Sequence, residues 1–277
     1  MNRLVKIIAF GNEMRHRYKK HHITAFSAQM SYFFILSLFP FLIFLVSLIG
    51  WFSIDNVWVV SNLSNMIPKE AAQIILDYVE DVLLTGTSII SVSIIATLWT
   101  ASKAINALMR ALNIVYEVPE TRGYLKVRIL GMFYTILFAF AIVLALVLPS
   151  MGHDFFNLVQ RFIEVPRGFI DLFTSLRWIG VLVFLGIVIG STHVIMPNTR
   201  ITIRSALPGT LFSLFGWTVI SYGFSYFIEN FSRFSIIYGS LTAVIVLMVW
   251  MYMSGIILMF GGEINHYLFE KKESMGK

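Results

Sequence analysis

The sequence predicts an all-α membrane protein with six transmembrane helices, and two observations carry this prediction. First, 57% of the 277 residues are apolar and only 13% are charged, with a mean hydropathy of +0.79. Second, 155 residues fall in six stretches of 18 or more that contain no Lys, Arg, Asp or Glu. A soluble domain carries about 25% charged residues, and a helix needs about 20 residues to cross a bilayer. The composition therefore argues against a soluble enzyme and predicts a single membrane domain over residues 1–277.

Each predicted span occupies one of the charge-free stretches. The spans are expected at about 29–52, 87–109, 129–148, 178–196, 206–227 and 237–262. Pro40 lies inside the first span and removes one helical hydrogen bond, so a kink is expected there. The second helix should continue beyond the membrane boundary, because no helix breaker occurs before Pro119. Pro149 and Pro197 mark the ends of the third and fourth spans.

Three further segments are amphipathic but too polar to span. Residues 1–28 place apolar side chains beside six basic residues, which fits either a helix on the anionic inner leaflet or a plain basic flank. The segment at about 56–85 contains apolar residues at helical spacing, and the segment at about 153–177 is rich in phenylalanine. Both are expected as amphipathic helices in external loops.

The distribution of charge predicts the orientation of the chain. Sixteen of the 21 Lys and Arg residues lie on the side of the membrane that holds both termini, and five lie on the other side. With the acidic residues included, the two sides carry +10 and −4. By the positive-inside rule, both termini are expected in the cytoplasm. The net charge of +6 is then a topology signal, and no nucleic-acid partner is expected.

Sequence motifs for enzymatic or metal chemistry are missing. The chain has no cysteine, which removes thiolate nucleophiles and Cys-containing metal sites. Its six histidines form no HExxH or HxHxDH pattern, and the sequence contains no GxSxG or Walker loop. We therefore expect no enzymatic activity, no cofactor, no metal site and no ATP-driven transport.

Polar residues beside the apolar stretches gather in the predicted cytoplasmic half. A stripe on the second helix, within an arc of about 80°, consists of Lys103, Asn106, Arg110 and Asn113. Buried charges usually face a cavity, so the stripe is a candidate substrate pathway; alternatively, its cations are ordinary anchors past the interface. The other candidates in this half are Gln29, Tyr32, His193 and Glu263. Pairing of Glu263 with Lys103 or Arg110 would offset the cost of burying the carboxylate.

Four segments resemble the YihY/BrkB family of bacterial inner-membrane proteins. They are SAQMSYFFILSLFPFLIFLVSLIG at Ser27–Gly50, SKAINALMRALNIVY at Ser102–Tyr116, ALPGTLFSLFGW at Ala206–Trp217 and YGSLTAVIVLMVWMYMSGIILMFGGEIN at Tyr238–Asn265. The resemblance extends over about 20–270 and implies a multi-pass protein of the bacterial cytoplasmic (inner) membrane. Gln29, Met30 and Ala104 depart from the commoner residues without breaking the polar stripe.

The family resemblance also bears on function. Members carry the old label ribonuclease BN, some are called virulence factors linked to serum resistance, and one relative is connected with export of lipid A precursors. The leading prediction is a transporter or translocator, not driven by ATP, of a lipid-like, amphiphilic or anionic molecule, with membrane lipids as partners. The alternatives are a non-transporting scaffold or regulator of envelope components and, least favoured, a ribonuclease, whose metallohydrolase histidine cluster is missing here.

Overall fold

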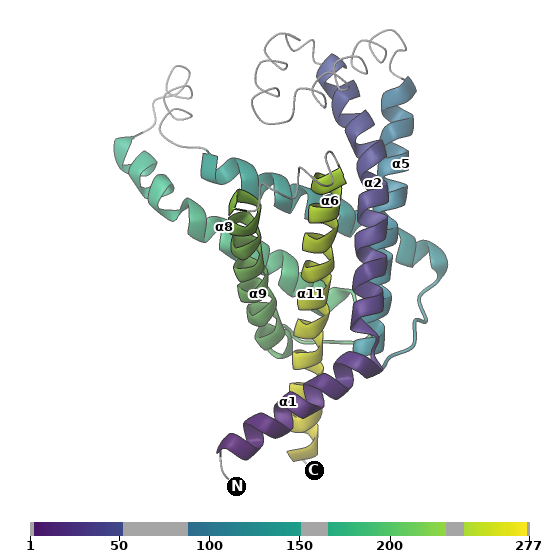
Figure 1. The fold of residues 1–277 in the computed structure, drawn as a ribbon, viewed down its shortest axis with the longest axis vertical. Helices are drawn as coiled ribbons and strands as arrows, with labels where there is room; N and C mark the ends of the chain where they lie inside the picture. The colour runs from purple at the N-terminus through teal and green to yellow at the C-terminus, as the bar shows by residue number, and fades with distance from the viewer. Residues whose placement is uncertain (1–2, 52–87, 151–165, 231–240, 276–277) are drawn as a thin grey trace.

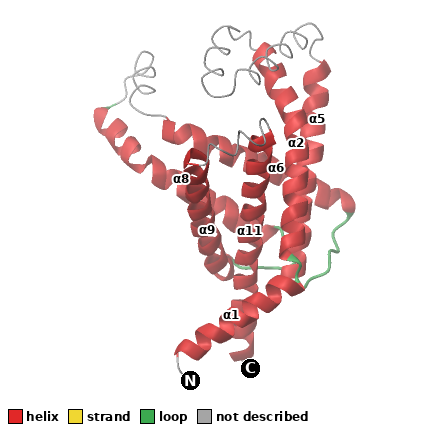
Figure 2. Cartoon of the chain, in the orientation of Figure 1, coloured by secondary structure: helices red, strands yellow, loops and turns green. Residues whose placement is uncertain are grey.

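The computed structural model describes residues 3–51, 88–150, 166–230 and 241–275, and every regular element in these ranges is an α-helix (Figures 1 and 2). The helices are α1 (Arg3–Lys20), α2 (Ile23–Trp51), α5 (Ser88–Val115), α6 (Tyr124–Ser150), α8 (Arg167–Ile195), α9 (Ile203–Asn230) and α11 (Leu241–Met275). The all-α prediction is therefore confirmed for the described part of the chain.

Three described helical segments are long and apolar enough to cross a membrane. They are Tyr124–Ala141, Ser175–Ile195 and Val244–Lys272, and a shorter apolar segment covers Ile23–Ser37. Many large apolar side chains on these helices are exposed, among them Ile136, Trp178 and Met253. Such surfaces would be unfavourable in water but suit contact with lipid tails. The chain is thus a membrane protein with several apolar helices.

Several helix ends follow the sequence signals, and one predicted boundary does not. The helix α5 continues to Val115 as expected, and α8 ends at Ile195, two residues before Pro197. The helix α6 includes Pro149 and is described as far as Ser150, so its end lies outside the described residues. The helix α8 begins after Pro166, so residues 167–177 are continuous with the predicted fourth span instead of forming a separate external helix. The reason is that no helix breaker separates them. The predicted external segments at 56–85 and 153–165 lie outside the described residues.

Six of the helices form a closed ring of neighbours. The packing partners are α2 with α5, α5 with α6, α6 with α8, α8 with α9, α9 with α11, and α11 with α2. In addition, α11 contacts α5. Figure 1 shows α2, α5, α9 and α11 running roughly along the long axis of the molecule, while α6 and α8 run obliquely across it. The helix α1 crosses the end of the ring where the chain termini lie, and it contacts α2 and α11.

The main apolar core lies where α2, α5 and α11 meet. Leu108 and Leu112, on the face of α5 opposite the polar stripe, are buried as the helical periodicity predicts. They lie in one cluster with Met30 of α2 and Met259 of α11. The helices α9 and α11 approach closely at Gly209, where a Cβ atom would collide with the facing backbone of α11. This contact sets the position of the polar residues that follow on α11.

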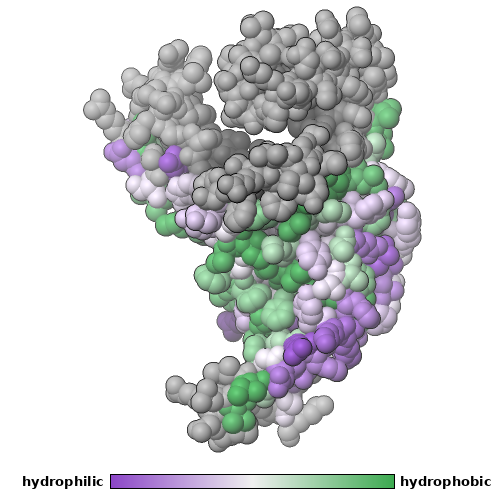
Figure 3. Space-filling view, viewed as in Figure 1, coloured by the Kyte–Doolittle hydropathy of each residue, from purple (hydrophilic) through white to green (hydrophobic). Residues whose placement is uncertain are grey.

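Polar and apolar residues separate along the molecule. Figure 3 shows hydrophilic residues gathered over much of α1 and mostly apolar residues over the helices above it. The helix α1 still exposes Val5 and Ile8 beside its basic residues. The helical structure of the basic amino-terminal segment is thus confirmed, while its location at a membrane surface stays a prediction.

Candidate functional site

The polar stripe of α5 does not act as one unit. Lys103 is half-buried, with its Nζ 5.7 Å from the centroid of the Phe33 ring on α2. Asn106 packs against Gly131 of α6, and its Oδ1 is buried without a hydrogen-bond partner. Arg110 is exposed. These three residues therefore have three separate surroundings.

Asn113, the last stripe residue, is buried and joins two loops. Its Oδ1 accepts a hydrogen bond from the backbone N–H of Asn198 at 2.7 Å, and its Nδ2 donates to Glu120 Oε2 at 2.8 Å. Arg122 donates to the same carboxylate, and these hydrogen bonds lower the pKa of Glu120 to about 2. Asn113 thus ties the α5–α6 loop to the turn between α8 and α9.

The two candidates on α2 are both at least partly exposed on the surface of the molecule. Gln29 is half-buried and Tyr32 is exposed. The ring of Tyr32 packs edge-on against Phe33, with centroids 5.3 Å apart. Phe33 also lies beside Lys103, so the ring of Phe33 contacts both Tyr32 and Lys103.

The remaining two candidates, His193 and Glu263, are fully buried. His193 Nε2 lies 3.3 Å from the hydroxyl of Ser213 on α9. Glu263 Oε1 binds the Nδ1 atom of His21, in the turn between α1 and α2. The predicted pairing of Glu263 with Lys103 or Arg110 is therefore wrong. The α1–α2 turn places His21 against the carboxylate instead.

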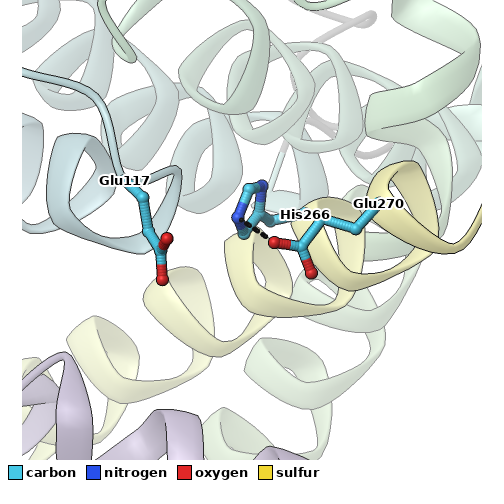
Figure 4. Close-up of side chains that lie close together, drawn as sticks. All are labelled: Glu117, His266 and Glu270. Atoms are coloured by element: carbon cyan, nitrogen blue, oxygen red, sulfur yellow. Dashed lines mark ion pairs between the residues drawn. The ribbon is translucent and has the colours of Figure 1, made fainter. Parts of the chain in front are cut away.

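A group that we name the His–Glu cluster surrounds this pair. It consists of His21, Glu117, Glu263, His266 and Glu270. His21 Nε2 lies 3.4 Å from Glu117 Oε1, and His266 Nε2 lies 3.1 Å from Glu270 Oε1. Figure 4 shows His266 and Glu270 on α11, with Glu117 opposite them at the end of α5. The ligand atoms of these three residues all lie within 4.8 Å of one another.

Two left-handed backbone residues position the cluster. Glu117 has φ 52° and ends α5, where its N–H donates to Ile114 O and the N–H of Val118 donates to Asn113 O. This pair of hydrogen bonds is the Schellman motif, which favours glycine at the residue that Glu117 occupies. A side chain in this conformation costs about 1–2 kcal/mol. Strain kept in this way is typical of functional sites.

The turn between α1 and α2 uses the same device. His22 has φ 50° and lies directly after His21. The chain therefore bends at this point, and α1 lies obliquely across the end of α11 (Figure 1). Arg17 of α1 then donates hydrogen bonds to Glu13 at 2.8 Å and to Glu270 at 2.5 Å. The turn and the α1 ion pairs together close one side of the His–Glu cluster.

A shallow pocket, open to the surface, adjoins the cluster at the end of α5. Its volume is about 450 Å³, and it is lined by Lys20, His21, Asn113, Ile114, Glu117 and Val118. Lys20 Nζ lies 2.5 Å from Glu117 Oε1, and this hydrogen bond lowers the pKa of Glu117. The pocket therefore combines the Lys20–Glu117 ion pair with the polar side chains of His21 and Asn113 and the apolar side chains of Ile114 and Val118.

The sequence alone does not reveal most of this site. In the sequence, His21 and Glu117 are far from each other and from the residues of α11, so no fixed spacing in the sequence connects them. The one local signal is the spacing of His266 and Glu270, which places them on the same face of a helix. Of the predicted site residues, Glu263 belongs to the His–Glu cluster and Asn113 lines the pocket.

Known proteins similar to this chain cover nearly its whole length. The ribonuclease-like protein YfkH of Bacillus subtilis is 36% identical, over 96% of this chain and 97% of that protein. The UPF0761 membrane protein PBPRA3489 of Photobacterium profundum is 25% identical, over 98% of this chain and 84% of its own length. A UPF0761 membrane protein of Alteromonas mediterranea is 24% identical, over 93% and 87% respectively. No solved structure matches the chain.

The family comparison agrees with the resemblance seen in the sequence. The family model described as Virulence factor BrkB matches residues 14–276. This range includes the pocket, the His–Glu cluster and the described helices, apart from residues 3–13 of α1. The chain belongs to the Virulence factor BrkB family.

Proposed function

We propose that this protein is a membrane transporter or translocator of a lipid-like, amphiphilic or anionic molecule, and that ATP does not drive it. The observation that carries the proposal is the pocket at the end of α5. Lys20, which is paired with Glu117, brings a cation to the pocket, while Ile114 and Val118 offer apolar surface beside it. An anionic group of the substrate would replace Glu117 as the partner of Lys20. A molecule with an anionic group and an apolar part matches both features.

The surroundings of the pocket support an amphiphilic substrate. The helices beyond it expose apolar side chains that lipid tails would cover, so the apolar part of an amphiphile could lie against them while its polar group occupies the pocket. The sequence contains no Walker loop. Transport would therefore be driven by an ion gradient or by the concentration gradient of the substrate itself.

The proposed topology has six spans in the bacterial cytoplasmic (inner) membrane, with both termini in the cytoplasm. The location of the amino and carboxyl ends at one end of the molecule supports an even number of spans (Figure 1). The excess of Lys and Arg on that side supports its cytoplasmic location. The pocket would then open to the cytoplasm, near the negatively charged inner leaflet.

A second candidate function is a membrane scaffold or regulator that binds envelope components without transporting anything. The exposed basic residues of α1, including Arg15 and Lys19, favour this candidate because they offer a charged surface. One relative has a ribonuclease-like name. We propose no enzymatic activity for this chain, and cleavage of RNA by the purified protein in metal-free buffer would overturn that.

Transport by purified protein tests the proposal. Proteoliposomes that contain a fluorescent phosphatidylglycerol should move the labelled lipid between leaflets faster than protein-free liposomes. Ile114→Trp should slow this movement because the larger side chain fills the pocket, and Lys20→Ala should slow it by removing the cation. Lys126→Ala is the matched control, since Lys126 is an exposed lysine that does not line the pocket.

The same assay separates the candidates. Equal rates for wild-type and protein-free liposomes would contradict transport of this lipid class and favour the scaffold. Equal rates for wild type and Ile114→Trp would remove the pocket from the pathway. Lys103→Ala is included because equal rates for that variant would remove Lys103 from the mechanism.

A further inference from the structure

We infer that the His–Glu cluster binds one divalent transition-metal ion through Glu117, His266 and Glu270, with His21 as a fourth ligand. This inference goes beyond the proposed function and does not depend on transport. It also revises the expectation from sequence motifs that the chain has no metal site. The ligands come from three parts of the chain that meet only in the fold. Figure 4 shows two of these parts, Glu117 after α5 and His266 with Glu270 on α11.

The spacing of the candidate ligand atoms suits a small metal ion. Zinc binds nitrogen and oxygen ligands at about 2.0–2.2 Å, so tetrahedral ligands lie about 3.3 Å apart. His266 Nε2 and Glu270 Oε1 are 3.1 Å apart, and His21 Nε2 and Glu117 Oε1 are 3.4 Å apart. The widest separation among Glu117, His266 and Glu270 is within 4.8 Å. A small rotation of the exposed Glu117 side chain would close the set.

Three buried atoms in the cluster make no hydrogen bond of good geometry, although the two histidine nitrogens among them lie 3.4 Å and 3.1 Å from carboxylate oxygens. The three atoms are His21 Nε2, His266 Nε2 and Glu263 Oε2, on residues with 3%, 9% and 0% exposure respectively. A buried polar atom without a partner is costly, and such atoms are rare in folded proteins. A metal ion would satisfy both imidazole nitrogens at once.

Glu263 prepares His21 for this role. It accepts the hydrogen bond of His21 Nδ1, which leaves Nε2 with a lone pair that faces Glu117. A carboxylate behind a histidine is the usual arrangement around protein-bound zinc, because it fixes the tautomer and the ring orientation. Glu263 is therefore a positioning residue and not a ligand.

The charge of the cluster also matches a divalent ion. Three carboxylates belong to the cluster, those of Glu117, Glu263 and Glu270, and a fourth, Glu13, lies beside it on Arg17. Two permanent cations, Arg17 and Lys20, pair with them. With both histidines neutral, four negative and two positive charges leave a net charge of −2. One divalent ion balances this charge without protonating either histidine.

The chemistry of the ligands narrows the choice of ion. Imidazole with carboxylate suits zinc, iron, cobalt or manganese, whereas magnesium prefers oxygen ligands and retains water. Zinc is the practical probe because it undergoes no redox change. The bound ion would connect the α1–α2 turn, the end of α5 and α11.

Binding of zinc to the full chain tests the inference. The protein is purified in detergent without a histidine tag, stripped with a chelator, and titrated with Zn²⁺ in a calorimeter. Wild type should bind one zinc ion per chain. His266→Gln and Glu117→Gly should each weaken binding by more than about tenfold, since even residues behind the ligands change metal affinity about 10–100-fold.

Two features of the design protect the result from a folding artefact. Glu117→Gly removes a ligand but relieves the left-handed backbone, so the fold should tolerate it even if His266→Gln unfolds. His16→Gln is the matched control, because His16 is an exposed histidine of α1 that does not belong to the His–Glu cluster. His16→Gln should bind zinc with the affinity of wild type.

Thermal unfolding gives a second readout. Zinc should raise the unfolding temperature of wild type and of His16→Gln, and it should leave that of Glu117→Gly unchanged. Wild type that binds no zinc, or Glu117→Gly that binds it as tightly as wild type, would overturn the inference. Either result would leave the transport assay, which contains no added metal, unaffected.

Discussion

Replacement of Glu263 by alanine should strongly destabilise the protein. The carboxylate is fully buried and its partner His21 is 3% exposed, so water cannot replace the lost contact. Removing one member of a buried charged pair costs about 3–5 kcal/mol, and we expect a loss of this size. Glu263→Gln keeps the volume and one hydrogen bond, so it should cost about 1–2 kcal/mol.

The free energy of unfolding in mixed detergent micelles measures this effect. A double-mutant cycle of Glu263→Ala with His21→Ala should give a coupling energy of about 2–3 kcal/mol, because both single variants remove the same contact. Asp171→Asn is the matched control for loss of a carboxylate. Asp171 is exposed on α8, so this variant should change stability by less than about 0.5 kcal/mol.

The reasoning fails if Glu263→Ala costs no more than Asp171→Asn. It also fails if the effects of Glu263→Ala and His21→Ala add to within about 0.5 kcal/mol, since additivity indicates sites that do not touch.

Three further predictions follow from the packing and the charges. Gly209→Ala should destabilise the protein by at least about 2 kcal/mol through collision with α11, whereas Gly223→Ala, which has open space around it, should be nearly neutral in the same unfolding assay; equal effects would contradict the close approach. The pKa of Glu120 is lowered to about 2, so its contribution to stability is present above its ordinary pKa of 4.5 and is lost as the pH falls toward about 2. Glu120→Gln should therefore show a smaller loss of unfolding free energy between about pH 6 and about pH 3 than wild type, and an equal loss would refute the assignment. Lys103→Ala and Glu263→Gln should add to within about 0.5 kcal/mol, and a larger coupling energy would restore the contact expected from the sequence.

The helices were predictable because their signals are local. Periodicity placed Leu108 and Leu112 on the buried face of α5, and Pro197 marked the end of α8 to within two residues. The boundary before Trp178 was wrong because a change from mixed to purely apolar composition does not break a helix. Only backbone chemistry, such as a proline, ends a helix at a defined residue.

The site was predictable only in part, because its contacts are not local. Charge at the ends of the apolar stretches singled out Glu263, which is central to the His–Glu cluster. Its partner His21 could not be found, since the turn that delivers it depends on His22 in a conformation that sequence patterns assign to glycine or asparagine. The position of Glu117 could not be predicted either, because it too has a left-handed backbone conformation, at the end of α5.

The central claim is that the pocket at the end of α5 opens to the cytoplasm and accepts an anionic amphiphile. The chain has no cysteine, so Ile114→Cys introduces a single reactive thiol at the pocket. We predict that a membrane-impermeant maleimide labels this residue in inverted membrane vesicles but not in intact spheroplasts, and that added phosphatidylglycerol slows the labelling. Labelling from the outer face, or labelling that this lipid does not slow, would contradict the claim.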